Sequence, residues 1–354
     1  MNVLVVSLKF NPGHFSHLIA NYNLFLDHGF KPYLYVNKSF NKMDEFHKYE
    51  IINSFKRVKD LKTIEAAVFW FPSFFNIIEI IRLRVLYKSK IVYIFHEPFD
   101  SIKNYYSSGF SFKKICKIFL VNLVNIIVII LAHTIILPSS KAFNLYKKKY
   151  AFLNKNFSLI PLIFDDEAGP LLIENKKRYI SYIGTIAADH AFDCYIYFVE
   201  SCMENNWFPD VSFLIATKDE IPADERKIIN PYLDNGRIVI AEGHTMSNRE
   251  INSYYGDSLI VWNAYHRSMQ SGVLPKAYMF GAAVIGTCYC NNEFIENHIT
   301  GVLVNDNKNI VEIKSAVIEI LGKRELFFKN CRNKFLENFY YKKRVKDFIS
   351  FLGN

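Results

Sequence analysis

The sequence predicts an α/β protein with two doubly wound, Rossmann-like domains, each built on a parallel sheet. Three observations lead to this prediction. A chain of 354 residues exceeds the size of one ordinary hydrophobic core. Apolar residues make up 51% and charged residues 22% of the chain, which suits two packed cores and excludes a disordered protein. Short apolar runs alternate with helical segments in two series, and a turn-rich acidic stretch separates the series.

The first series starts with a buried strand over residues 2–8 and a turn at 11–13. A helix over 15–28 follows, and Gly29 closes it at the position where helices often end in a left-handed residue. The remaining strands of this series are short apolar runs, predicted at residues 32–36, 67–71, 90–95 and 134–137. This alternation is typical of a parallel sheet.

The alternation breaks near Pro161, where residues 165–170 are acidic and turn-rich. We expect this stretch to be a solvated linker between domains rather than a metal-binding motif. A second series of strands follows, predicted at residues 179–183, 211–216, 237–241, 258–262, 282–286 and 301–304. The tail from residue 313 onward is helical and mixed in charge. The first domain is therefore expected over residues 1–165 and the second from residue 166.

The net charge of +9 indicates an anionic partner, which is either nucleic acid or an anionic membrane surface or substrate. The basic residues cluster beside aromatic ones, at 112–115 and 146–150. The sequence has no zinc-finger, RRM or homeodomain pattern. This favours the membrane surface or an anionic substrate over nucleic acid.

The cysteines predict a reducing compartment, and so the cytoplasm. There are six, scattered along the chain without the Cys-x-x-Cys pairs of a zinc site. The first residues also lack the basic region and the long apolar run of a signal peptide.

Residues 115–131 are long and apolar enough to cross a membrane. Two interpretations remain open, a buried or membrane-dipping helix and a true span. The run leads directly into the strand predicted at 134–137, as a helix of a parallel sheet does, and this favours the first interpretation.

Residues 270–287 form the most specific stretch: a small-residue loop, a short helix, a glycine stop at Gly281 and a buried strand. The helix starts between Ser271 and Leu274, and its free amides would suit a diphosphate. The alternative is an ordinary helix–strand unit with a serine cap. Physical arguments alone do not distinguish a diphosphate site from an ordinary helix–strand unit.

The same stretch resembles the C-terminal signature of glycosyltransferase family 4 and its relatives of GT-B fold. The matching segments are 276–277, 281–285, 291–296 and 300–304, with their spacing kept. The resemblance implies a GT-B fold, with a C-terminal helix over 340–354 that returns to the first domain. It also implies a second domain over 166–339 that binds a nucleotide-sugar. Gly184 and Thr185 resemble the family's start of that domain, and Gly243 and His244, with Glu250 beyond them, resemble its base-binding loop.

The chain departs from the family at its charged positions. The paired glutamates of the family fall on Ser268 and Lys276, and its phosphate-binding Arg and Lys are missing where Asp189 stands. Lys276 and Arg267 are candidate substitutes that would neutralise a diphosphate beside Ser271 and Gly272. A decayed, silent site is the alternative. Glu293 matches the family position that reaches the donor sugar or ribose. Alternatively, the carboxylate of Glu293 only stabilises the start of a helix.

In the first domain, His96 and Glu97 follow a buried strand, and His14 follows the first strand. At strand ends a histidine is placed to polarise or deprotonate an acceptor hydroxyl, so these three are the candidate catalytic residues. The alternative is a packed turn held by Pro98. No Gly-x-Gly-x-x-Gly pattern is present, which argues against a nicotinamide or flavin.

We therefore expect a glycosyltransferase that moves a sugar from a nucleotide donor to a lipid-linked saccharide in bacterial surface polysaccharide synthesis. It would need no metal and would lie on the inner face of the cell membrane. The rival hypotheses are a non-catalytic scaffold of the same fold, a sugar-nucleotide epimerase and an integral membrane protein.

Overall fold

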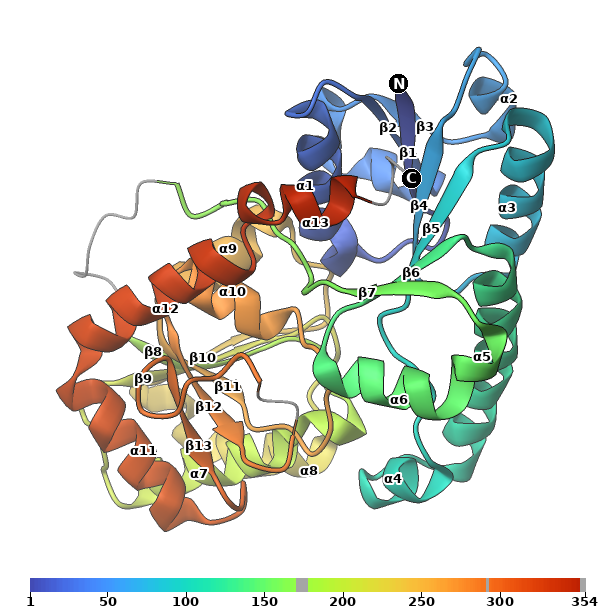
Figure 1. Ribbon diagram of the computed structural model, residues 1–354. Helices are drawn as coiled ribbons and strands as arrows, with labels where there is room; N and C mark the ends of the chain where they lie inside the picture. Colours follow the sequence, from blue (N-terminus) through green and yellow to red (C-terminus); the bar gives the residue numbers. More distant parts are fainter. Residues whose placement is uncertain (170–177, 291–292, 351–354) are drawn as a thin grey trace. The chain divides into compact units, whose positions relative to one another are not determined.

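The computed structural model describes residues 1–169, 178–290 and 293–350 (Figure 1). The chain divides into two compact units. The first unit comprises residues 1–165 and 338–354, and the second comprises residues 166–337. Each unit is described by itself below.

The first unit is built on a seven-stranded parallel sheet in the order β3-β2-β1-β4-β5-β6-β7. Its strands are β1 (Asn2–Ser7), β2 (Lys31–Val36), β3 (Ile51–Ile52), β4 (Ala66–Trp70), β5 (Lys90–Ile94), β6 (Thr134–Leu137) and β7 (Asn156–Leu159). The apolar residues of β1 are fully buried, as expected of a parallel sheet covered on both faces. The two edge strands, β3 and β7, are the ones that the apolar runs do not predict.

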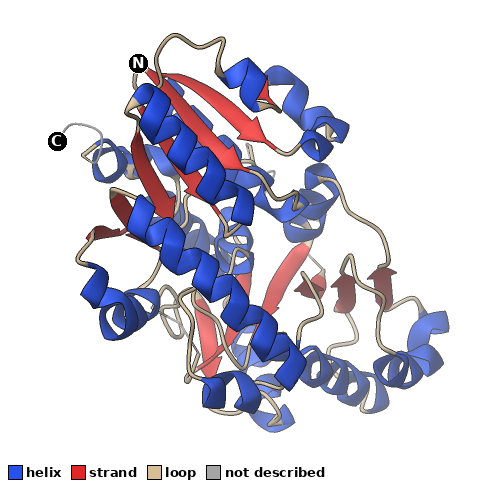
Figure 2. Cartoon of the chain, turned by 90° about the vertical axis from the view of Figure 1, so that its right-hand side faces the viewer, coloured by secondary structure: helices blue, strands red, loops and turns tan. Residues whose placement is uncertain are grey.

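The helices of the first unit begin at serine caps in four cases, at Ser73, Ser101, Ser111 and Ser139, whose hydroxyls each accept a backbone N–H. The helices are α1 (Phe15–Leu26), α2 (Phe55–Val58), α3 (Phe74–Tyr87), α4 (Ile102–Ser107), α5 (Phe112–Leu131), α6 (Ser140–Tyr150) and α13 (Val345–Ile349). Figure 2, which views the chain from the side of α3 and α5, shows long helices in front of the sheet.

The second unit is built on a six-stranded parallel sheet in the order β10-β9-β8-β11-β12-β13. Its strands are β8 (Tyr179–Ile183), β9 (Ser212–Ala216), β10 (Ile238–Ala241), β11 (Ser258–Asn263), β12 (Ala283–Thr287) and β13 (Gly301–Val304). Its helices are α7 (Phe192–Glu204), α8 (Ala223–Ile229), α9 (Asn248–Gly256), α10 (Val273–Met279), α11 (Ile310–Gly322) and α12 (Arg324–Asn338). All six strands predicted for this half are present, and the two doubly wound sheets confirm the predicted fold class.

The acidic stretch at the boundary between the units is half-buried and its carboxylates are paired, so the prediction of a freely solvated linker is corrected. Asp165 accepts a hydrogen bond from Asn23 at 2.7 Å, and Asp166 pairs with Arg332. Glu167 pairs with Lys276 at 2.7 Å. Each carboxylate has a partner more than a hundred positions away in the sequence, which no local pattern reveals. Pro170, the last residue of the predicted linker, lies outside the described residues.

The C-terminal segment returns to the first unit, but not as the one continuous helix expected over 340–354. α12 ends at Asn338, and Tyr340 then forms a parallel bridge with Phe164. A 3-10 turn over Tyr341–Lys343 and the short α13 follow. The Tyr341 hydroxyl donates to Asp27 at the end of α1, at 2.7 Å. Residues 351–354 lie outside the described part of the chain.

Gly301, the first residue of β13, leaves no room for a side chain. A Cβ at this position would stand 2.5 Å from the carbonyl oxygen of Val284 in β12. We expect Gly301→Ala to lower the free energy of unfolding by about 1–3 kcal/mol, measured by urea denaturation. Gly322→Ala, at the end of α11, is the control, because a Cβ there meets nothing within 4 Å. An equal loss in both variants would contradict the prediction.

Candidate functional site

Gly184, directly after β8, turns the chain at the carboxyl edge of the second sheet. Its φ of +144° is a conformation that side chains rarely adopt, and a Cβ there would approach Val273 to 3.7 Å. Val273 is the first residue of α10, so the turn at Gly184 and Thr185 lies against the start of that helix. In open α/β sheets, ligands bind at this edge.

Arg267, in the loop after β11, reaches the same region. Its side chain is 4% exposed, and a guanidinium nitrogen lies 3.7 Å from a carboxylate oxygen of Asp189. The Asp189 carbonyl accepts the backbone N–H groups of His266 and Arg267. His190 stacks on Tyr265 with ring centroids 4.4 Å apart. The loop that follows β8 and the loop that follows β11 are thus joined by the ion pair of Arg267 and Asp189.

Ser271 and Gly272 precede α10 directly. The Ser271 hydroxyl accepts the backbone N–H of Val273 at 3.1 Å and also interacts with the phenol of Tyr265. Burial raises the pKa of Tyr265 well above its ordinary value, so this phenol stays protonated. The N-cap residue of α10 is Gly272, which makes no side-chain capping bond, and Ser271 before it belongs to the same loop as Arg267.

Gly243 and His244 follow β10 and lie near the same edge of the sheet. Asp219 links the loops: its carboxylate accepts the backbone N–H of Ile186 at 2.8 Å, and its carbonyl accepts that of Gly243 at 3.3 Å. His244 lies 3.9 Å from Glu250. Glu250 itself closes a capping box with Ser247 at the start of α9, so a structural role accounts for this carboxylate.

The structure does not support Lys276 as a diphosphate ligand. Its ammonium donates to Glu167 at 2.7 Å, to Asn252 at 2.7 Å and to Asn248 at 3.3 Å. An ammonium has three donors, and three protein acceptors use them. Both asparagine amides also donate back to Glu167, which closes the cluster. Lys276 is therefore a buried structural cation, although burial lowers its pKa.

Glu293 is exposed in a turn between β12 and β13. The described residues that follow it, 293–300, form turns and a bridge rather than the helix that such a position precedes in the resembling family. The Tyr278 hydroxyl of α10 holds this segment through the Phe294 carbonyl and the Thr300 hydroxyl. Asn291 and Asn292, which belong to the same motif, lie outside the described residues.

In the first unit, His14 and His96 are brought together at the carboxyl edge of the sheet by Phe71. The His14 ring stacks on Phe71 at 3.5 Å, and the His96 ring lies 5.8 Å from Phe71. Phe71 directly follows β4 with a φ of +58°, a strained conformation for an aromatic residue. Glu97 is exposed beside His96.

The hydrogen bonds of Asn11 distinguish the two histidines. The Asn11 amide oxygen accepts the backbone N–H of Gly13, so its amide nitrogen is the group 2.9 Å from His14 Nε2. An amide nitrogen only donates, and Nε2 must therefore accept. His14 is also buried, whereas His96 is half-buried. Of the two, His96 is the better placed to take a proton from a ligand.

Asp193, Cys194 and His266 are the described residues whose arrangement most resembles a metal site, with ligand atoms within 4.8 Å of one another. The Asn307 amide nitrogen donates to Ala264 and faces His266 Nδ1, so Nδ1 accepts and the ring proton stays on Nε2. Burial, and next the Asp193 carboxylate, raise the pKa of Cys194 to about 12.

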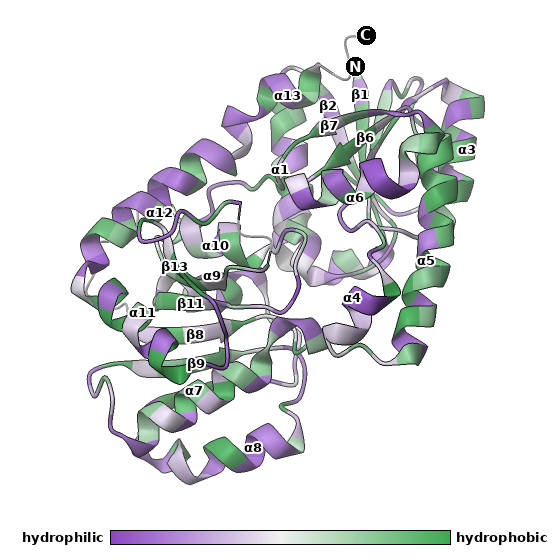
Figure 3. Ribbon diagram, turned by 60° about the horizontal axis from the view of Figure 1, so that its bottom comes forward, coloured by the Kyte–Doolittle hydropathy of each residue, from purple (hydrophilic) through white to green (hydrophobic). Residues whose placement is uncertain are grey.

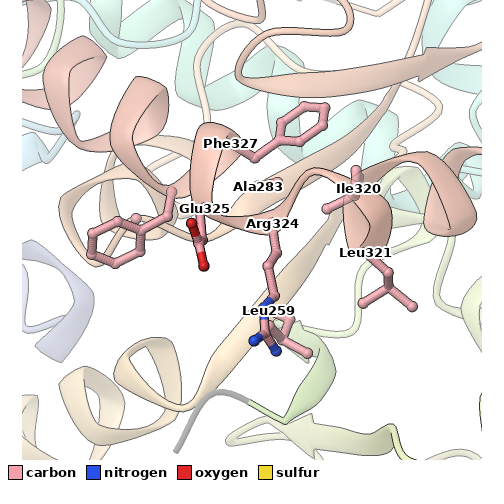
Figure 4. A pocket seen from close by; sticks show the side chains of 9 residues that line it. Leu259, Ala283, Ile320, Leu321, Arg324, Glu325 and Phe327 are labelled. Carbon is pink, nitrogen blue, oxygen red and sulfur yellow. The ribbon is translucent and has the colours of Figure 1, made fainter. Parts of the chain in front are cut away.

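A small apolar cavity of the second unit, lined by Leu259, Ala283, Ile320 and Phe327 among others, lies away from these residues (Figure 4). Leu259 and Ala283 stand at the amino ends of β11 and β12, opposite the edge that carries Gly184. Its volume of about 30 Å³ has room for a water molecule or two and not for a nucleotide. The candidate site is therefore the loop cluster at the carboxyl edge.

Comparison with known sequences gives a partial match. No family model matches the sequence. A stretch of 127 residues is 26% identical to an uncharacterized glycosyltransferase of Methanocaldococcus jannaschii. This stretch covers 35% of the chain and 32% of the relative, so the match spans about a third of that protein's length.

Comparison with solved structures covers the whole chain. Sucrose-phosphate synthase from Thermosynechococcus elongatus matches with a TM-score of 0.69 at 12% identity, over 99% of this chain and 97% of that one. Anabaena HepE in complex with UDP and glucose matches with a TM-score of 0.71 at 12% identity, over 99% of both chains. WaaG, a glycosyltransferase involved in lipopolysaccharide biosynthesis, matches with a TM-score of 0.63 at 10% identity, over the full length of both. Together with the two parallel sheets, these likenesses show that the chain has the GT-B fold.

Proposed function

We propose that this protein is a glycosyltransferase that moves a sugar from a nucleotide-sugar to a saccharide acceptor. The observation that carries the proposal is the cluster of loops at the carboxyl edge of the second sheet, in a chain of GT-B fold. This cluster joins Gly184 and Thr185 to Arg267, Ser271 and, through neighbouring loops, Gly243. The comparison structure of HepE contains UDP and glucose, which supports the same ligand class here.

The second unit would hold the nucleotide-sugar. Negative charge develops on the diphosphate as the donor bond breaks, and a fixed cation near it stabilises that charge. Arg267 is the candidate cation, with the amides around Gly272 and the Thr185 backbone as further donors. His244 and Gly243 would face the base, and Glu293 the sugar or ribose. No metal ion is needed in this scheme, because Arg267 supplies the positive charge.

The first unit would bind the acceptor. His96 would take the proton of the attacking hydroxyl, with Glu97 beside it and His14 stacked on Phe71 as a support. We propose a lipid-linked saccharide as the acceptor and bacterial surface polysaccharide as the product. The protein would then lie in the cytoplasm on the inner face of the membrane, in contact with anionic lipid through the basic-aromatic segments 113–117 and 147–150. The net charge of +9 supports this placement.

The direct test is a thermal-shift screen against UDP-, GDP-, CMP- and dTDP-sugars, followed by calorimetry with any nucleotide that stabilises the protein. Stabilisation by one nucleotide class is expected. If no nucleotide binds, the proposal fails and a non-catalytic scaffold takes its place. Conversion of the free nucleotide-sugar to an epimer without any acceptor would instead identify an epimerase.

Arg267→Ala is expected to weaken the binding of the stabilising nucleotide by about tenfold to a hundredfold, because a hydrogen bond to a charged group contributes about 1.5–3 kcal/mol. The measurement is the Kd from calorimetry, with the melting temperature recorded to exclude unfolding. Arg249→Ala, on the exposed start of α9, is the control and should keep the wild-type affinity. Equal affinity in both variants would remove Arg267 from the site.

A further inference from the structure

Helix α5 buries two asparagines among its core residues and exposes a largely apolar side, unlike an ordinary helix of a soluble protein. Asn122 and Asn125 face inward and accept hydrogen bonds from the buried hydroxyls of Tyr150 and Tyr93, respectively. The outward side is apolar instead. Its exposed residues are Phe112, Phe119, Leu120, Val121, Leu123, Ile127 and Ile130. Water is therefore a poor solvent for this side of the helix.

Helix α3, which packs against α5, also buries polar residues and exposes apolar ones. Its buried residues include Asn76 and Glu79, and Glu79 pairs with Arg82 at 2.7 Å. Its exposed side chains include Phe74, Phe75, Ile81, Val85 and Leu86, and the neighbouring α4 adds Ile102 and Tyr106. We call these exposed apolar residues of the three helices the α3–α5 face. Figure 3 shows apolar residues along both α3 and α5.

The exposed charges of the three helices are all positive. Their basic residues are Arg82, Arg84, Lys103, Lys113, Lys114 and Lys117, and their one acid is the buried Glu79. Three of the lysines occupy the first turns of α5, beside the exposed Phe112. An apolar surface bordered by lysines fits the interface of an anionic bilayer, where the apolar side chains enter the acyl region and the ammonium groups meet phosphates.

Helix α5 is long and apolar enough to span a membrane, but it is fixed to the sheet. Val128 and Ile129 are fully buried in the core of the first unit, together with Ile135 of β6. A span would need lipid on all sides of the helix and would remove these residues from the core. The helix is therefore suited to lie in the interface plane with one side on the protein.

We propose that the α3–α5 face inserts into the acyl region of one leaflet of an anionic bilayer, with α5 parallel to the membrane plane. A second copy of the chain is a less suitable occupant, because it would bring two faces of the same positive charge together, whereas an anionic bilayer neutralises that charge. The inference extends the membrane association proposed above. It is tested without donor or acceptor, so its failure would leave the sugar transfer untouched.

The test is co-sedimentation of the full chain with vesicles of phosphatidylcholine containing about one third phosphatidylglycerol. The variant Leu120→Glu/Ile127→Glu places two charges seven residues apart on the exposed side of α5. Its partition coefficient should fall at least about tenfold. The control Val311→Glu/Ile318→Glu has the same spacing and chemistry on the exposed side of α11 and should bind as the wild type does.

A second pair of variants separates local charge from net charge. Lys113→Ala/Lys114→Ala/Lys117→Ala removes the lysines next to the α3–α5 face. Lys342→Ala/Lys343→Ala/Lys346→Ala removes three lysines with the same spacing from the C-terminal segment. Binding to anionic vesicles should fall about tenfold or more in the first variant and much less in the second. Equal losses would mean attraction by net charge alone and would overturn the proposed orientation.

Two further results would overturn the proposal. One is a failure in the lipid-binding assay. Either the wild-type chain does not bind anionic vesicles, or the α5 and α11 glutamate variants lose binding equally. The other is self-association of the wild type without lipid, seen by sedimentation velocity, which Leu120→Glu/Ile127→Glu abolishes. That second result would make the face an interface between copies. Circular dichroism of each variant shows whether it is folded, since all four glutamate positions are exposed.

Discussion

Replacing Lys276 with methionine is expected to lower the free energy of unfolding by about 3–5 kcal/mol. The substitution keeps most of the side-chain volume and removes the charge. It leaves the carboxylate of Glu167 without its cation, and it leaves the amide oxygens of Asn248 and Asn252 without the donor that they share. A charge that stays buried without its partner accounts for the size of the loss. The measurement is the midpoint and slope of urea unfolding.

The partner residue provides the internal check for this prediction. In the double variant Lys276→Met/Glu167→Gln the orphaned charge is gone, so the loss should be smaller than the sum of the two single losses. Lys323→Met is the matched control, because Lys323 pairs with Glu319 at 3.1 Å on the surface. Exposed pairs of this kind contribute about 0–1 kcal/mol.

Unchanged stability together with lost nucleotide binding would identify Lys276 as a nucleotide ligand. If Lys276→Met folds with wild-type stability and loses nucleotide binding, the ammonium must leave Glu167 when the donor binds. If it loses stability and the residual folded protein still binds nucleotide, the cluster is structural. The two outcomes are distinguished by measuring both quantities on the same variant.

The strands could be predicted from the sequence because they are buried on both faces. Most of the predicted strands read as short apolar runs, as residues 3–6 of β1 do. The edge strand β7 could not be predicted, since its residues are mostly exposed and lack such a run. The fold class could thus be predicted from the buried strands, and the prediction of a strand is weaker where its residues are exposed.

The partners of charged residues could not be predicted, because they depend on contacts between distant parts of the chain. Lys276 and Glu167 are 109 residues apart, and Asp166 and Arg332 are 166 apart. The sequence showed that Lys276 replaces a family glutamate. It did not show that the carboxylate of Glu167 accepts a hydrogen bond from Lys276. The sequence likewise showed an apolar α5 without showing that Asn122 and Asn125 face inward.

For the first unit, His96→Ala is expected to lower kcat by about a hundredfold to ten-thousandfold, the usual contribution of a general base. The Kd of the nucleotide should stay unchanged, because the residues proposed to bind it belong to the second unit. The measurement is sugar transfer at saturating donor and acceptor, once the screen has identified the donor.

His14→Ala gives the comparison that decides between the two histidines. The Asn11 amide donates to His14 Nε2, and the His14 ring supports Phe71, so its loss should reduce stability more than the chemical step. His47→Ala, at an exposed position, is the control and should retain full activity. A kcat that falls in His14→Ala and not in His96→Ala would reverse the assignment of the base. Phe71 contacts both rings, so a third variant, Phe71→Leu, is informative. If kcat falls equally in His14→Ala, His96→Ala and Phe71→Leu, the three residues act as one unit.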